Sequence, residues 1–89
     1  MRFRVSWTPL AEQDLAAVWL NADDRNAVTR AATAIDQLLA DDPETRGEPL
    51  FDTVRTVCLD PLGVHFEVVD ADLIVYVLTA WDTTKGTPP

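Results

Sequence analysis

The sequence is short of cations. Seven Lys and Arg residues stand against fifteen Asp and Glu residues, which gives a formal net charge of −8. Proteins that bind nucleic acid through bulk electrostatics neutralise phosphates with Lys and Arg. The composition therefore argues against DNA binding by this chain on its own, although it leaves room for a small local basic patch.

Cysteine and long apolar runs are also scarce. The single cysteine, Cys58, has no partner for an internal disulfide, which is typical of a reducing compartment. No apolar stretch follows the first four residues as a secretory signal requires. No run approaches the roughly 20 residues that span a bilayer. We therefore expect a cytoplasmic protein without a membrane segment.

The residues that are present are typical of a folded domain. Apolar residues make up 47% and charged residues 25% of the 89 residues, which is the usual mixture in soluble globular proteins. A chain of this length forms one domain. We expect residues 1–89 to be a single unit with a core over 2–81 and a tail over 82–89.

The first half of the sequence predicts a strand and two helices. Apolar and polar residues alternate from Phe3 to Trp7, and this period of two indicates a half-buried strand. Thr8 and Pro9 suit the start of a helix, which we expect over residues 9–20. A second helical pattern covers residues 24–40. Because only a short turn separates the two helices, they should pack as an antiparallel hairpin.

The second half predicts a loop and then strands. Residues 41–52 contain proline, glycine and many acids, so we expect a loop there. Three strand-like segments follow at residues 54–58, 63–69 and 73–81. The last should be central in the sheet because both of its faces are apolar. The order is β-α-α-β-β-β, an α+β domain with an antiparallel sheet of about four strands and a helical hairpin packed on one face.

Three stretches carry a resemblance to a known family. They read VSWTPLAEQDLAAVW, RNAVTRAATAIDQLLADDP and VRTVCLDPLGVHFEVVDADLIVYVLTAW. In this order and spacing they resemble the RelE/ParE superfamily of toxin–antitoxin toxins, which includes plasmid-stabilisation-like proteins. The resemblance extends from about Phe3 to Trp81. It implies a compact toxin that a small antitoxin protein holds silent.

The same resemblance implies a function as the toxin-like component of a type II toxin–antitoxin system. RelE-like members cleave mRNA in the ribosomal A site, and inhibition of translation in this way is the activity expected here. That cleavage uses no metal, and we expect neither a metal nor a cofactor. The alternatives are a catalytically silent binding protein of the same fold and a ParE-like inhibitor of DNA gyrase.

Three residues are candidates for a catalytic role. Arg55 matches a basic residue that the family often carries on the first strand of the closing meander, and it could bind a phosphate bidentately. His65, the only histidine, could act as a general acid or base. Lys85 is the one cation after the last predicted strand. Each also has a structural interpretation: an exposed strand arginine, a surface histidine paired with Glu67, and a solvated tail lysine.

The segment after the last predicted strand differs from the family's pattern. Family members commonly continue there into Arg or Lys with His or Tyr nearby, whereas this chain passes through Trp81–Thr84 before it reaches Lys85. The sequence therefore leaves open whether the chain is an enzyme, which by resemblance would be an endoribonuclease. An exposed tryptophan, Trp19 or Trp81, would instead be a candidate anchor for a partner protein.

Overall fold

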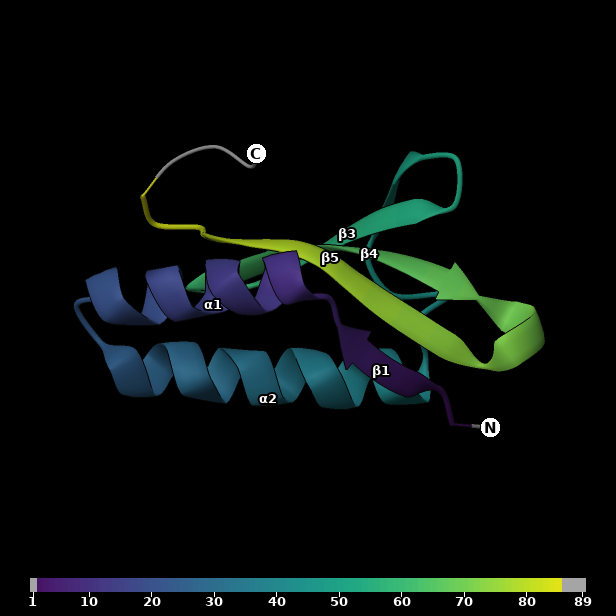
Figure 1. Ribbon diagram of the computed structural model, residues 1–89, viewed down its shortest axis with the longest axis horizontal. Coiled ribbons are helices and arrows are strands. Elements are labelled where there is room, and N and C mark those ends of the chain that lie inside the picture. The colour runs from purple at the N-terminus through teal and green to yellow at the C-terminus, as the bar shows by residue number, and fades with distance from the viewer. Residues whose placement is uncertain (1, 86–89) are drawn as a thin grey trace.

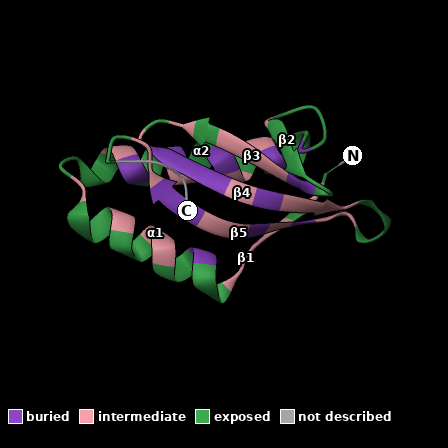
Figure 2. Cartoon of the chain, turned by 90° about the horizontal axis from the view of Figure 1, so that it is seen from above, coloured by how far each residue is buried: buried purple, intermediate pink, exposed green. Residues whose placement is uncertain are grey.

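A computed structural model describes residues 2–85 of the chain (Figure 1). Five strands form one sheet, and two helices cover one of its faces (Figures 1 and 2). Neither helix in this part of the chain is long and apolar enough to cross a membrane. Along the chain the elements are β1 (Arg4–Trp7), α1 (Pro9–Asn21), α2 (Arg25–Asp41), β2 (Glu48–Phe51), β3 (Val54–Leu59), β4 (Leu62–Val69), a 3₁₀ turn (Asp70–Asp72) and β5 (Ile74–Asp82).

The sheet is mixed and has five strands. The strand order is β1-β5-β4-β3-β2, and β1 runs parallel to β5 while the other neighbours are antiparallel. The α+β class is confirmed, and the prediction of about four antiparallel strands is corrected to five strands with one parallel pair. Both helices and three strands separate β1 from β5, so no tight turn fixes their relative direction. β5 is an interior strand, as its apolar faces predicted, although β4 holds the middle position.

The loop predicted over residues 41–52 contains a strand. β2 pairs with β3 at one edge of the sheet (Figure 2), and the register shifts between Pro49 and Phe51. All four residues of β2 are exposed. Gly47, just before β2, has a φ of 76°, and a Cβ there would lie 2.5 Å from the carbonyl oxygen of Thr56. A short edge strand that contains a proline shows little periodic pattern, which explains why the sequence did not predict it.

Both helices begin at side-chain caps. The Thr8 hydroxyl accepts a hydrogen bond from the Ala11 amide at 3.2 Å, and Pro9 takes the first helical position. The Asp24 carboxylate accepts a hydrogen bond from the Ala27 amide at 3.1 Å and caps α2. The predicted hairpin is confirmed, because α1 and α2 lie side by side and run in opposite directions (Figure 1).

The core lies between the helices and the sheet, and α2 contributes more to it than α1. Val64 and Phe66 on β4, like Val75 and Val77 on β5, point toward the helices. Because strand side chains alternate, the residues between them point to the opposite, open face of the sheet. The buried residues of the main cluster are Ala11, Ala31, Ile35, Leu39, Leu62, Val64, Phe66, Val75, Val77 and Ala80.

Candidate functional site

The open face of the sheet carries a row of polar side chains. His65 on β4 lies opposite Thr56 on β3 and Thr79 on β5. The Thr56 hydroxyl oxygen lies 2.8 Å from Nδ1 of His65. This hydrogen bond orients the imidazole and engages Nδ1, so acid–base chemistry at this histidine would use Nε2.

Trp81 packs beside this row. The rings of His65 and Trp81 lie 4.7 Å apart between centroids, at an interplanar angle of 48°. Trp81 is only 8% exposed. Gly63 pairs with it across the sheet, and a Cβ on Gly63 would lie 2.5 Å from the indole carbons. The glycine therefore lets the indole lie against the β4 backbone, and Trp81 is a packing residue and not an exposed anchor.

Arg55 lies on the opposite face of β3 from Thr56, because successive side chains alternate along a strand. Its guanidinium donates hydrogen bonds to the carbonyl oxygens of Arg46 at 3.4 Å and Gly47 at 3.3 Å. These bonds connect β3 to the loop that precedes β2. The structure therefore separates Arg55 from the row around His65.

Acids surround Arg55. Glu44, Asp52 and Asp70 line the same recess, which has a volume of about 180 Å³. A side-chain hydrogen bond with Asp70, together with the negative charge of that residue, raises the pKa of Glu44. Three carboxylates outweigh one guanidinium, so the electrostatics of this recess disfavour a phosphate group.

Lys85 lies at the end of α1. Its Nζ contacts the carbonyl oxygen of Asn21, the last residue of that helix, where a cation complements the partial negative charge of the helix end. Thr83 holds the segment in place. Its hydroxyl donates to Asp60 Oδ1 at 2.7 Å, and its amide donates to the Pro61 carbonyl oxygen at 2.9 Å.

The three predicted catalytic residues are thus not brought together. Arg55 and His65 lie on opposite faces of the sheet, and Lys85 lies at the end of the helical hairpin. Their catalytic roles remain predictions. Of the predicted tail over 82–89, Asp82 belongs to β5, and residues 86–89 lie outside the described residues.

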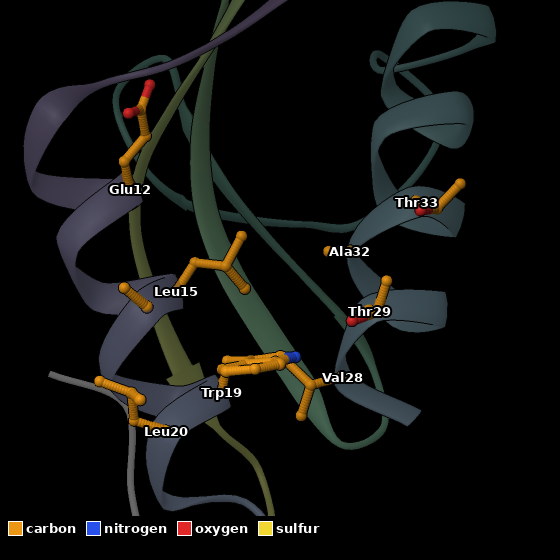
Figure 3. A pocket seen from close by; sticks show the side chains of 9 residues that line it. Glu12, Leu15, Trp19, Leu20, Val28, Thr29, Ala32 and Thr33 are labelled. Atoms are coloured by element: carbon orange, nitrogen blue, oxygen red, sulfur yellow. The ribbon is translucent and has the colours of Figure 1, made fainter. Parts of the chain in front are cut away.

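A groove runs between α1 and α2, with a volume of about 510 Å³ (Figure 3). The Trp19 side chain reaches from α1 toward Val28 on α2 and lies across one end of the groove (Figure 3). Trp19 is 39% exposed and Leu20 is 61% exposed, so Trp19 is the tryptophan that fits the predicted partner anchor. The apolar lining residues are Leu15, Ala16, Trp19, Leu20, Val28 and Ala32.

The two ends of the groove differ in charge. Arg25 lies over the Trp19 ring, 4.7 Å from its centroid, and donates to two carbonyl oxygens at the end of α1, each at 3.2 Å. At the other end, Glu12 and Asp36 line an adjoining recess together with Trp7. The indole Nε1 of Trp7 donates to Asp36 Oδ1 at 3.1 Å. The groove therefore has a cation near one end and two carboxylates at the other.

Sequence reasoning did not single out Leu20, Glu12 or Asp36 as site residues. Leu20 is an apolar residue near the end of the first predicted helix, and nothing in its local pattern shows that it is exposed. Glu12 lies in the first turn of α1, where the helix dipole by itself favours an acid. Asp36 carried no signal, because its position beside Trp7 depends on the packing of α2 against β1.

No family model and no curated protein matches the sequence. Among solved structures, the toxin–antitoxin complex RelBE2 from Mycobacterium tuberculosis matches with a TM-score of 0.77 and 15% identity, over 92% of both chains. The chromosomal ParDE toxin–antitoxin system from P. aeruginosa matches with a TM-score of 0.70 and 19% identity, over 91% of this chain and 96% of that one. The chain thus has the fold of the RelE/ParE toxins.

The fold also occurs inside a longer protein. TrmO from Pseudomonas aeruginosa matches 89% of this chain with a TM-score of 0.59 and 25% identity, but the match covers only 35% of the TrmO chain. One fold can serve several activities. The function of this chain must therefore be argued from its own surfaces.

Proposed function

We propose that this chain is the toxin-like component of a type II toxin–antitoxin pair and that its partner is a small antitoxin protein. The groove between α1 and α2 carries the proposal. Its apolar walls include Trp19 and Leu20, which are 39% and 61% exposed. Grooves with apolar walls can accept apolar side chains of another protein, and an exposed tryptophan is a typical binding anchor. The pair would act in the cytoplasm.

The mode of action that the site favours is inhibition by protein contact, with DNA gyrase as the kind of target that the family resemblance offers. RNA cleavage without a metal needs cations around the scissile phosphate and a group that moves a proton. Arg55 donates instead to backbone carbonyl oxygens and faces carboxylates. Lys85 contacts the end of α1. Neither cation supports a phosphate site around His65.

Ribosome-dependent mRNA cleavage is the second candidate, and the geometry of His65 favours it. Thr56 orients the imidazole at 2.8 Å, and Trp81 packs against its side. A histidine held in this way is a suitable general acid or base. In that case the ribosome would have to supply the cations that neutralise the scissile phosphate of the mRNA.

Induced expression in a bacterial culture tests the proposal. Growth is followed with and without the small open reading frame that neighbours the gene. The expected result is that induction arrests growth and that co-expression of the neighbouring open reading frame relieves the arrest. Normal growth, with folded protein confirmed in the same cells, would contradict the toxin-like role and favour the silent binding protein.

The same culture separates the two modes of action when it expresses His65→Gln. If the protein acts by contact, the variant still arrests growth and cells form filaments, as gyrase inhibition predicts. If it cleaves mRNA, the variant loses its effect because glutamine cannot exchange the proton. The Glu67→Gln variant, two residues along the same face of β4, serves as the control.

A further inference from the structure

We infer that Asp14 on α1 is a positioning residue for His65 on the far face of the sheet. Its carboxylate holds a bulge in β5, and this bulge places Thr79 and Trp81 beside the imidazole. The inference deepens the second candidate function, ribosome-dependent cleavage, and rests on that function only for its effect on growth.

The bulge is one extra residue in β5. Phe66 on β4 pairs with Val77 on β5. His65, which precedes Phe66, pairs with Thr79. Leu78 is therefore the extra residue, and an insertion of this kind is a β-bulge. It lies opposite the step from His65 to Phe66 on β4.

The bulge decides which side chains lie beside the imidazole. A shift of one residue moves the side chains of a strand to the other face of its sheet. Without the extra residue, Leu78 would lie opposite His65, and Thr79 and Trp81 would point toward the helices. With it, Thr79 lies opposite His65. The Trp81 ring then packs 4.7 Å from the imidazole, between centroids.

The start of α1 fixes the near side of the bulge. β1 ends at Trp7, which pairs with Val77, so β1 offers no partner to the residues of β5 beyond Val77. Thr8 follows immediately. Its amide donates to the Val77 carbonyl oxygen at 3.0 Å, and its hydroxyl donates to the Leu78 carbonyl oxygen at 3.3 Å.

Asp14 fixes the far side of the bulge. Its Oδ2 accepts a hydrogen bond from the Ala80 amide at 3.2 Å, and this bond is partly buried. Hydrogen bonds that involve an ionised group are stronger than neutral ones. The extra residue is thus enclosed between two contacts from α1. Asp14 does not line the groove between the helices, so a substitution there tests the bulge and not the groove.

The resulting arrangement is not the most stable one for these residues. Among residues 2–85, Oγ1 of Thr79 is the buried side-chain polar atom without a hydrogen-bond partner. A buried hydroxyl that forms no hydrogen bond lowers stability. Departures of this kind are expected at functional sites, and this one lies directly opposite His65.

NMR spectra of the full chain test the inference. The chain has one histidine, so the imidazole signals are assigned without ambiguity. Asp14→Ala removes the acceptor, whereas Asp14→Asn keeps an oxygen that can accept from the same amide. Asp24→Ala is the matched control, because it also removes a carboxylate that accepts from a backbone amide, at 3.1 Å and within α2.

In Asp14→Ala, the imidazole proton signals should move toward those of an unfolded histidine, because the ring-current shift from Trp81 is lost. The Ala80 amide should exchange with solvent about tenfold faster, since its acceptor is gone. Asp14→Asn and Asp24→Ala should keep the imidazole signals of the natural chain. Alanine is a good helix former, so Asp14→Ala should remain folded. Asp14→Ser, whose hydroxyl is too short to reach the amide, is a second variant that should show the same changes.

A purely structural role for Asp14 gives a different result. Asp14→Ala would then unfold at a lower urea concentration, but its imidazole signals would remain those of the natural chain, and this would overturn the inference. An imidazole shift of equal size in Asp24→Ala would also overturn it, because the shift would then report a general loss of stability.

The growth experiment separates this inference from the proposed function. If the chain arrests growth through His65, Asp14→Ala should lose most of the arrest and Asp14→Asn should retain it. Full arrest by an Asp14→Ala variant with shifted imidazole signals, when His65→Gln is inactive, would overturn the inference. If His65→Gln still arrests growth, shifted signals in Asp14→Ala support the positioning role and remove only the cleavage function.

Discussion

The two helices of the hairpin use their apolar residues in opposite ways. α2 buries Val28, Ala31, Ile35, Leu39 and Ala40, whereas Ala11 is the one fully buried residue of α1. α1 instead leaves Leu10, Trp19 and Leu20 exposed. α2 therefore supplies most of the buried helical side chains, whereas α1 leaves an apolar surface exposed to solvent.

The largest expected loss of stability comes from a substitution on the buried face of α2. Ile35 is fully buried, so Ile35→Ser leaves a cavity and a buried hydroxyl and should lower the free energy of unfolding by about 3–5 kcal/mol. This is a large part of the about 5–15 kcal/mol that stabilises a typical domain. Urea unfolding followed by circular dichroism measures the loss.

Leu20→Ser is the matched change on α1. Because Leu20 is 61% exposed, its replacement should change the free energy of unfolding by no more than about 0.5 kcal/mol. Equal losses in the two variants would show that α1 and α2 contribute alike, and the contrast between them would then be wrong.

A smaller effect is expected at the helix starts. Thr8 caps α1 through its hydroxyl and also donates to the Leu78 carbonyl oxygen of β5 at 3.3 Å. Asp24 caps α2 at its exposed end with one bond to Ala27. Thr8→Ala should therefore cost about 1–2 kcal/mol and Asp24→Ala about 0.5–1 kcal/mol. Thermal unfolding of both variants checks the order, and a larger loss from Asp24→Ala would contradict it.

The smallest effect concerns the tail that meets the end of α1. Hydrogen bonds from Thr84 lower the pKa of Asp82. A carboxyl whose pKa is lower in the folded state stabilises the fold above its ordinary pKa, and this contribution disappears as the pH falls through the lowered value. Thr84→Ala should thus be slightly less stable than the natural chain at pH 7 and equal to it in strong acid.

Urea midpoints of both proteins at neutral and acidic pH measure this difference. It should be small because Asp82 is partly exposed to solvent. A difference that persists below the ordinary pKa of an aspartic acid, about 3.9, would mean that Thr84 acts through packing and not through the Asp82 charge.

Local patterns predicted most of the fold. The alternation before Trp7, the cap at Thr8 and the apolar period of the helices are properties of neighbouring residues, and the structure confirms the elements that they indicated. The parallel pairing of β1 with β5 joins segments about 70 residues apart, and no local pattern encodes it. β2 was missed because Pro49 and its exposed neighbours lack a buried face.

The candidate site was predictable only in part. The sequence identified Trp19 as a possible anchor, and the structure leaves it exposed at the groove. The sequence could not show that Glu12 and Asp36 line one recess, because this depends on how α1 and α2 pack. Nor could it place Arg55, since the register of β3 decides which face of the sheet receives the guanidinium.

The contact between Gly63 and Trp81 constrains how this sequence can change over time. The indole lies where a side chain at position 63 would be, so Gly63→Ala alone meets ring atoms at 2.5 Å. A smaller residue at position 81 would remove the clash but leave a gap beside the imidazole of His65. Positions 63 and 81 are therefore expected to accept substitutions only as a pair, so that related sequences change at both positions together.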